Sequence, residues 1–404
     1  MSDGVAYLQT TTAIRERCQN VLAATRASKS RWFTVNDAAL AGAADKVADV
    51  TRQRYPTLNI PYHSRWRHFE PGGLDRRALL DTALGDVSPA EKARAHIDLA
   101  VVSVLLDAGA GAAWRYVEAS NGQTFTRSEG LGIASFHAFM QGTFSSDPSQ
   151  PLRADANGLK ALNAERLAPV FQVAADNPLV GLAGRTSLMQ SLGAALASQR
   201  QWFGSGMRPG SLFDALTDYG SRNSIRADEV LAALLRGLGS IWPSGHQLGG
   251  VALGDCWQHP LAGGTGATTG WIPIHKLSQW MTYSLLEPFE WAGVQLTDLD
   301  ALTGLAEYRN GGLLVDSGVL IAAPELLSQG YAPSDEPIIE WRALTVALLD
   351  ELAPLVRAAL GPSATNLPLA CVLEGGTWAT GRALATSLRG GEPPIRIVSD
   401  GTVF

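Results

Sequence analysis

Apolar residues recur at helical spacing along most of this 404-residue chain, and no long stretch keeps the strict alternation of a half-buried strand. The clearest apolar stripe covers residues 341–355, and Gly361-Pro362 follows it as a usual helix end. A period near 3.6 buries one side of a helix, whereas strand side chains alternate. We therefore predict a mainly α protein with one large domain over residues 1–404, an irregular loop at 55–76 and a Gly-rich C-terminal lid at 371–404.

Start and stop signals indicate where the helices lie. Ser88-Pro89-Ala90-Glu91 joins an N-cap, a proline at the first helical position and a glutamate that closes a capping box. The prolines within residues 55–76 forbid a long helix there. Helices are expected over residues 12–54 with a break near 29–30, from 89 onward, over 128–144, twice within 161–203, over 228–240 and over 271–291. Short strands are expected at 395–398, in a short mixed tail.

Charge and composition exclude several classes of function. A net charge of −6 argues against non-specific binding to nucleic acid or anionic membrane, and no apolar run is long enough to span a bilayer. The first residues, MSDGVAYLQT, lack the apolar segment of a signal peptide. Cys18, Cys256 and Cys371 are too far apart for a CxxC or metal motif, which is typical of reduced thiols. We expect a cytoplasmic protein that binds a small molecule, with no nucleic-acid or membrane partner; homo-oligomerisation is left open.

Residues 296–309, LTDLDALTGLAEYR, give the most specific local signal for function. Thr297 and Asp300 have the spacing of a capping box, so this stretch predicts a helix. That helix would deliver Glu307, Tyr308 and Arg309 to its end, just before a break at residues 311–312. Groups placed where a helix meets a loop are often binding groups. The same pattern also fits an ordinary helix whose Glu and Arg form a surface ion pair.

The Pro- and Gly-bounded loop YHSRWRHF (residues 62–69) gathers His63, Arg65, Trp66, Arg67 and His68. Arginines recognise phosphate or carboxylate through forked hydrogen bonds, and a tryptophan can stack on a planar base. The alternative is a loop packed on the surface, with arginine stems covering apolar area. Acidic or cysteine ligands are missing nearby in sequence, so a metal site is disfavoured.

Three further charged residues could each bind a substrate or have only a structural role. Glu129 lies near a predicted helix start, where the dipole alone stabilises it or where it holds a polar substrate. Lys276 follows His275 at another predicted start, where it meets a phosphate or is simply exposed. Glu374 precedes two glycines that permit close approach of a ligand or form tight turns. The Gly-rich residues 263–270 lack the order of a phosphate-binding loop.

Four segments together resemble the uracil catabolism protein 4 family of bacteria and fungi. They are IPYHSRWRHFEPGG, TRSEGLGIASFHAFMQGTFS, LEGGTWATGR and the terminal SDGTVF, and the resemblance runs over essentially the whole chain. It implies a role in the pyrimidine-degradation route in which uracil is first converted to its ribonucleotide and ribosylurea appears as an intermediate.

The chain is also similar, more distantly, to the queuosine salvage N-glycosidases. The stretches that carry this likeness are LTDLDALTGLAEYRNGGLLVDSGVL, IIEWRALTVALLDEL, HKLSQWMTYSLLEPFEWAG and, by position, LLDAGAGAAWRY with SEGLGIAS. The likeness implies a helical DNA-glycosylase-like core of the helix-hairpin-helix type and cleavage of a base from ribose 5-phosphate. The family's catalytic aspartate is replaced here by Glu307, which is one methylene longer. Lys276 falls on a lysine of the family's KRAQ helix, whereas the family's VPQ is replaced by Asn310-Gly311-Gly312.

These resemblances imply an N-glycosidase that hydrolyses a ribosylurea, as its 5-phosphate, or a related ribosyl intermediate. Glu307 would be the catalytic carboxylate, since N-glycoside cleavage builds positive charge on the sugar. No metal or redox cofactor is implied. The substrate-binding candidates are His63, Arg65, Trp66, Arg67, His68, Trp114, Glu129, His275, Lys276, Tyr308, Arg309, Glu374, Trp378, Arg382 and Asp400. Two alternatives stay open: a ureide or pyrimidine-ring hydrolase or lyase with His63 or His68 as base, and a non-catalytic scaffold for the pathway.

Overall fold

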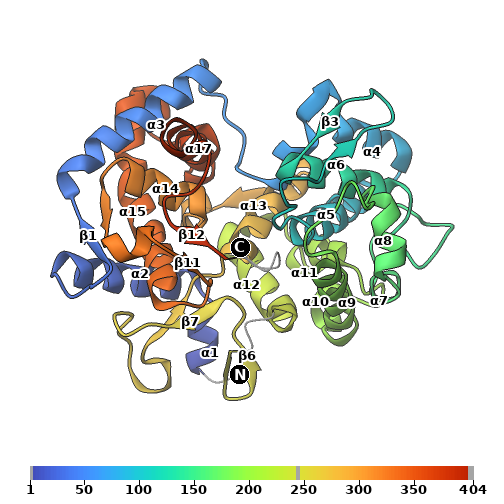
Figure 1. Cartoon of the computed structure of the whole chain (residues 1–404). Helices are drawn as coiled ribbons and strands as arrows, with labels where there is room; N and C mark the ends of the chain where they lie inside the picture. Colours follow the sequence, from blue (N-terminus) through green and yellow to red (C-terminus); the bar gives the residue numbers. More distant parts are fainter. Residues whose placement is uncertain (1–2, 243–245, 399–404) are drawn as a thin grey trace. The chain divides into compact units, whose positions relative to one another are not determined.

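The computed structural model describes residues 3–242 and 246–398, and the chain forms two compact units built from alternating segments (Figure 1). Among the described residues, unit 1 contains residues 3–63, 246–279 and 298–398, and unit 2 contains residues 64–242 and 280–297. Both units consist mainly of helices, and each sheet in the described part of the chain has two strands. The prediction of a mainly α protein is therefore confirmed.

Unit 1 is built from helices of the N- and C-terminal parts of the chain. Its helices are α1 (Asp3–Leu8), α2 (Thr11–Arg26), α3 (Leu40–Arg54), α14 (Tyr308–Asp316), α15 (Glu336–Leu360), α16 (Leu369–Val372), the π-helix η10 (Leu373–Thr377) and α17 (Trp378–Arg389). Its strands are β1 (Phe33–Val35), β5 (Gln247–Leu248), β6 (Val251–Ala252), β7 (Cys256–Gln258), β8 (Trp271–Pro273), β10 (Leu320–Ala322), β11 (Gly330–Tyr331) and β12 (Arg396–Ile397). Helix α13 (Lys276–Trp291) begins in unit 1 and ends in unit 2.

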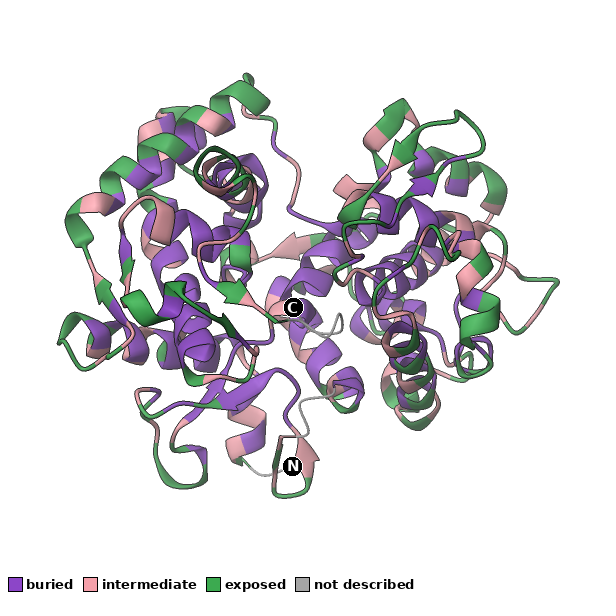
Figure 2. Ribbon diagram, in the orientation of Figure 1, coloured by how far each residue is buried: buried purple, intermediate pink, exposed green. Residues whose placement is uncertain are grey.

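Helix α15 forms the core of unit 1. Most of its 25 residues are buried, as the purple ribbon of this helix shows in Figure 2, and it packs against α2, α3 and α14. Gly361 ends it with a φ of 99°, a value that residues with a Cβ rarely adopt. The stripe predicted at 341–355 and its end at Gly361 are both confirmed. The helix supplies the apolar surface on which α14 is positioned.

The strands of unit 1 form short two-stranded pairs. Strand β1 pairs antiparallel with β10, and β7 pairs antiparallel with β8. Strand β12 pairs in parallel with β11, which confirms the predicted strand near 395–398. The expected helix over 271–291 is corrected at its start, because residues 271–273 form β8 and the helix begins at Lys276. Strands of two or three residues are too short to show an alternating pattern.

Unit 2 is also helical. Its 3-10 helices are η2 (Arg65–Phe69), η3 (Pro71–Gly73), η4 (Pro209–Ser211) and η5 (Gly239–Ile241). Its α-helices are α4 (Arg76–Leu84), α5 (Pro89–Leu105), α6 (Arg127–Met140), α7 (Ala156–Lys160), α8 (Ala164–Val170), α9 (Leu182–Ser198), α10 (Arg200–Phe203), α11 (Leu212–Leu216) and α12 (Ala227–Leu238). Its strands are β2 (Tyr116–Val117), β3 (Thr124–Phe125), β4 (Ser224–Arg226) and β9 (Gln295–Thr297). The irregular loop predicted at 55–76 is confirmed, since η2 and η3 are its only helical turns before α4 begins at Arg76.

Helix α5 starts where its sequence predicts. The Ser88 hydroxyl accepts the backbone N–H of Glu91 at 3.2 Å, and Pro89 occupies the first helical turn. Its buried Asp98 accepts the N–H of Gly210 at 2.6 Å and pairs with Arg208 at 2.8 Å. A Cβ on Gly210 would lie 2.3 Å from the Arg94 carbonyl oxygen, so only glycine lets this segment pack on α5.

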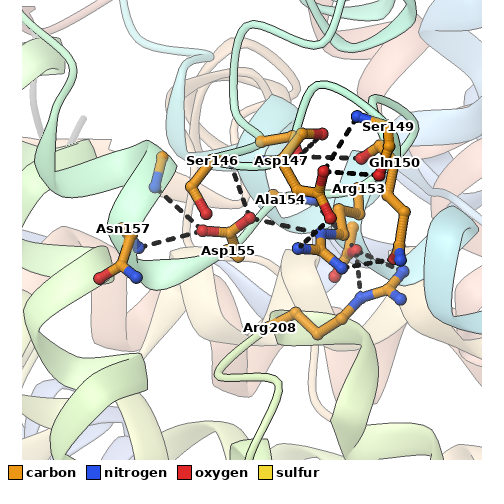
Figure 3. A network of polar contacts seen from close by, with 12 residues as sticks. Ser146, Asp147, Ser149, Gln150, Arg153, Ala154, Asp155, Asn157 and Arg208 are labelled. Carbon is orange, nitrogen blue, oxygen red and sulfur yellow. Dashed lines mark hydrogen bonds and ion pairs between the residues drawn. The ribbon is translucent and has the colours of Figure 1, made fainter.

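A polar network orders the loop before α7 (Figure 3). Asp155 is the N-cap of α7 and accepts the backbone N–H groups of Asn157 at 3.1 Å and Gly158 at 3.0 Å. Its other oxygen accepts the N–H of Ser146 at 2.9 Å, and Arg153 lies 3.4 Å away. These contacts replace water around the loop backbone and give its polar residues a structural role.

Among residues 3–242 and 246–398, no helix combines the length and apolar character needed to cross a bilayer.

Candidate active site

The segment before Glu307 is not the predicted helix over residues 296–309. Strand β9 ends at Thr297, a 3-10 turn covers Leu299–Ala301, and α14 begins only at Tyr308. Thr297 is paired with Arg226 in the parallel β4–β9 ladder, and the residues after Leu302 are buried without helical bonds. A Cβ on Gly304 would lie 2.7 Å from Leu349 of α15. Tertiary contacts with β4 and α15 thus override the local capping signal, and Glu307 stands where a helix begins.

Glu307 is the N-cap of α14. Its Oε2 accepts the backbone N–H of Arg309 at 2.8 Å, and its Oε1 accepts that of Asn310 at 2.6 Å. The residue is 9% exposed. Two backbone donors and the positive end of the helix therefore hold the carboxylate in one orientation.

Two ionisable groups from distant chain positions act on Glu307. Burial raises the pKa of Glu307 above its usual range, while the two backbone hydrogen bonds and the charges of Lys276 and His63 oppose that rise. Both Lys276 and His63 are thus close enough to act on the carboxylate. The prediction that Lys276 opens a helix is confirmed, since it is the first residue of α13.

His63 is held by a second carboxylate, Glu374. The ring Nδ1 of His63 lies 2.8 Å from Glu374 Oε2, and the His63 backbone N–H donates to the Ala370 carbonyl at 3.0 Å. Glu374 Oε1 accepts from Arg54 at 2.8 Å and from the Tyr55 hydroxyl at 3.1 Å. Burial alone would raise the pKa of Glu374, but His63 and Arg54 lower it to about 2. Glu374 is therefore ionised at neutral pH.

The two glycines after Glu374 allow helix α3 to approach the π-helix. A Cβ on Gly376 would lie 2.4 Å from the Thr51 hydroxyl and 2.5 Å from the Val47 carbonyl oxygen. The tight turns that the sequence left open as an alternative are not formed, because residues 369–389 form successive helical segments. Single π-helical turns within helices are frequent at functional sites, and this one carries Glu374.

A buried ion pair fixes the start of α13. The backbone N–H of Lys276 donates to Asp255 Oδ2 at 2.9 Å. The Arg342 guanidinium donates to both carboxylate oxygens of Asp255, at 2.9 and 2.7 Å. Burial opposes ionisation of Asp255, but Arg342 lowers its pKa to about 2. His275 is 1% exposed and its Nε2 lies 3.1 Å from the Leu8 carbonyl oxygen. His275 is therefore buried, whereas its neighbour Lys276 is only partly buried.

The residues that follow Glu307 serve mainly to anchor α14. The Arg309 guanidinium donates to the Gly391 carbonyl at 2.9 Å and lies 4.7 Å from the Tyr308 ring centroid. The expected break at Gly311-Gly312 is wrong, since both residues lie inside α14. A Cβ on Gly311 would lie 2.7 Å from the indole of Trp341, so glycine here permits close packing on α15. Arg309 orients Glu307 through its backbone N–H.

At the start of α17, the Arg382 guanidinium lies 5.4 Å from the ring centroid of half-buried Trp378. Asp400, also named from the sequence, lies outside the described residues.

Six of the sequence candidates belong to unit 2. Arg65 is fully buried; its guanidinium pairs with Asp107 at 2.8 Å and donates to Ser103 at 2.6 Å. Arg67 pairs with Glu287 at 2.7 Å. Trp66 is 2% exposed and packs edge-on against neighbouring aromatic rings.

The other three lie on or beside α6. Trp114 is fully buried and donates to the Phe171 carbonyl at 2.9 Å, which places it in the core of unit 2. His68 packs edge-on to Trp280, with ring centroids 5.7 Å apart. Glu129 lies in the first turn of α6, as predicted, and its charge acts on Arg65, whose pKa is lowered by burial.

Sequence reasoning missed Arg54, Tyr55, Asp255 and Arg342. Arg54 ends α3, where a basic residue is the ordinary complement to the helix dipole, so its position carried no functional signal. Asp255 and Arg342 are far apart in sequence and are joined only by folding. Within the described ranges, no three His, Cys, Asp or Glu side chains are arranged to hold a metal ion.

Comparison with known proteins places these residues in a family context. Residues 7–404 match the family model described as "Protein of unknown function (DUF1688)". The chain is 39% identical over 415 residues to "Protein urg3" of Schizosaccharomyces pombe, covering 100% of each chain. It is 35% identical over 436 residues to "Uracil catabolism protein 4" of Lachancea kluyveri, covering 99% of each chain.

Proposed function

Because this chain belongs to the DUF1688 family and is a full-length relative of Uracil catabolism protein 4, we propose that it acts in uracil catabolism as an N-glycosidase. Its substrate would be a ribosylurea carrying a 5-phosphate or a related ribosyl intermediate. The observation that carries this proposal is the buried, doubly hydrogen-bonded carboxylate of Glu307, on which the charges of Lys276 and His63 act. A helical DNA-glycosylase-like core is part of the same proposal.

The chemistry of N-glycoside cleavage calls for such a carboxylate. As the bond from C1′ to nitrogen lengthens, positive charge develops on the sugar ring. A fixed negative charge beside C1′ stabilises that state more than the neutral substrate, and burial strengthens the interaction because little water screens it. Glu307 is already oriented by the N–H groups of Arg309 and Asn310, so little reorganisation is needed during the reaction.

Lys276 supports binding of a charged substrate. Its backbone is fixed by Asp255, and its side chain is only partly buried while its charge reaches Glu307. An ammonium group can neutralise a phosphate, and the N-terminal turn of α13 adds to the local positive potential. Lys276 is therefore our choice for the residue that holds the 5-phosphate.

Product analysis tests this function directly. Purified protein is incubated with ribosylurea, its 5-phosphate, uridine and uridine monophosphate, and urea, uracil, ammonia and ribose phosphate are measured. We expect equal amounts of urea and ribose 5-phosphate from the phosphorylated ribosylurea. Ammonia released without free ribose phosphate would instead favour a ureide hydrolase with His63 as its base, and no product from any of the four would contradict the N-glycosidase.

The pH dependence of the same reaction has an expected sign. Glu307 must be ionised to stabilise the cation, and burial raises its pKa in the folded protein. Activity should therefore be full above that pKa and fall as the pH is lowered through it, starting above the ordinary range of a glutamate. The profile of kcat/KM against pH should show this acid limb, and an unchanged rate down to the ordinary glutamate range would contradict the role of Glu307.

A further inference from the structure

We propose that His63 donates the proton to the leaving nitrogen, and that Glu374 and Arg54 are positioning residues for it. This inference rests on the proposed function and adds the second half of its mechanism. An N-glycosidase that expels a ureide needs an acid, because a ureide nitrogen leaves poorly as an anion.

The geometry around His63 fits a proton donor. Glu374 contacts Nδ1 at 2.8 Å, and the backbone of His63 is tied to the Ala370 carbonyl at 3.0 Å. A carboxylate on Nδ1 keeps the proton of that nitrogen in place and leaves Nε2 to serve the reaction. This is the carboxylate-to-imidazole arrangement that orients histidines in many hydrolases.

Glu374 is itself held in one place. Arg54 contacts Oε1 at 2.8 Å, Tyr55 contacts the same oxygen at 3.1 Å, and Glu374 belongs to the π-helix that packs on α3. His63 contacts the other oxygen, Oε2, and the Arg54 guanidinium also donates to the Glu374 carbonyl and, at 3.1 Å, to that of Gly375. Together these contacts fix the position and the charge of Glu374. An ionised Glu374 stabilises the imidazolium form of His63 that a donor requires.

The charge of the His63 imidazole acts on Glu307, and the π-helix η10, whose Glu374 holds His63, packs against α14, the helix that Glu307 caps. The acid and the charge-stabilising carboxylate therefore belong to packed elements of unit 1, although their chain positions are 244 residues apart by number (307 − 63). A pair of titratable groups in contrasting environments is the usual way in which acid and base roles are separated.

The proposed steps balance. The bond between C1′ and nitrogen breaks, its electron pair goes to nitrogen, and that nitrogen takes a proton from Nε2 of His63. The oxygen of a water molecule forms a bond to C1′, and the proton that this water loses passes to Glu307. Transfer of that proton from Glu307 to His63 restores both groups. The sum is the addition of one water molecule, with no oxidant or reductant.

Two substrates that differ in their leaving group test this assignment. Ribosylurea 5-phosphate needs a proton on its leaving nitrogen, whereas the 5-phosphate of a nitrophenyl riboside does not. We expect His63→Gln to lower kcat/KM about 10²-fold or more on the first and little on the second. Glu307→Gln should lower both, because charge stabilisation is needed in each case.

Glu374→Gln provides the second variant if His63→Gln fails to fold. It should reproduce the leaving-group dependence in a weaker form and move the alkaline limb of the pH profile for the ureide to lower pH, since the imidazolium loses its ionised partner. A purely structural role would lower both substrates equally and leave the limb in place. His246→Gln, at a half-buried histidine of the same unit, is the matched control and should leave both rates unchanged.

Equal losses on the two substrates, or no loss on either, would overturn the role of His63 while leaving the N-glycosidase intact. A wild-type protein that cleaves neither substrate would overturn the proposed function and this inference together.

Discussion

Glu307→Gln is expected to lower kcat for urea release by about 10³-fold, with the fold retained. The substitution keeps the shape of the side chain and removes its charge. Glutamine can still accept one of the two backbone N–H groups that Glu307 holds, so the start of α14 should survive at a cost of about 0.5–2 kcal/mol. The rate loss is larger because the developing cation on the sugar then meets a neutral amide. Steady-state kinetics with the ribosylurea phosphate would measure it.

Asp316→Asn is a suitable control for this variant. Asp316 is the last residue of α14 and pairs with Arg389 at 2.5 Å, so its replacement also removes one carboxylate from the same helix. It lies at the opposite end of the helix from Glu307, and we expect kcat to stay near the wild-type value. A Glu307→Gln protein that releases urea at a near-normal rate would show that the carboxylate is only a helix cap.

The ionisation of Glu307 makes the stability of the folded protein depend on pH. Its raised pKa means that the folded protein binds the proton more tightly than the unfolded chain, so ionisation of Glu307 opposes folding. This unfavourable contribution is present in full above the folded pKa and disappears as the pH falls toward the unfolded value. A buried carboxyl group whose ionisation lowers the stability of the fold is typical of a functional group.

The fold was predictable where the determinants are local. The Ser88 cap, the Pro89 start of α5 and the stripe of α15 each depend on residues within one or two turns, and all three are confirmed. The helix predicted for the segment before Glu307 was wrong because its structure depends on distant residues. Thr297 has a capping spacing in the sequence, but its backbone pairs with β4, a strand that lies about 70 residues earlier in the chain.

The site was predictable in its residue types and not in its arrangement. Glu307, Lys276, His63 and Glu374 were each singled out from sequence or resemblance, and the structure brings these four together in unit 1. The contact between His63 and Glu374 spans 311 positions, and no periodicity or motif encodes such a pairing. Arg54 was missed because a basic residue at a helix end is ordinary until the π-helix is packed against it.

The role of several glycines could not be predicted from the sequence for a related physical reason. In sequence, Gly311-Gly312 predicts a break after Arg309, and the glycine pair after Glu374 leaves tight turns open beside close approach of a ligand, because glycine tolerates a positive φ. In the structure Gly311, Gly376 and Gly381 lie within helical segments, where the missing Cβ lets another element approach. Only the packing partner reveals which of the two roles a glycine has.

Gly381→Ala should therefore destabilise the protein by about 3 kcal/mol, the upper end of what overpacking usually costs. A Cβ at this position of α17 would lie 2.0 Å from the Arg309 carbonyl oxygen, and backbone cannot rotate away as a side chain can. Helices α14 and α17 must then move apart. Because Arg309 supplies one of the N–H groups that hold Glu307, the same movement should disturb the carboxylate and lower kcat. Denaturant unfolding and steady-state kinetics measure the two effects.

Gly42→Ala is the matched control, since it makes the same change inside helix α3 of the same unit. A Cβ there would meet nothing within 4 Å, so the gain in helix propensity should stabilise the protein by about 0.5–1 kcal/mol. The two glycine substitutions are thus expected to have opposite signs, because one adds a methyl group against backbone and the other adds it in open space. If Gly381→Ala were as harmless as Gly42→Ala, close packing of α17 on Arg309 could not be what fixes the start of α14, and the rigid placement of Glu307 would need another source.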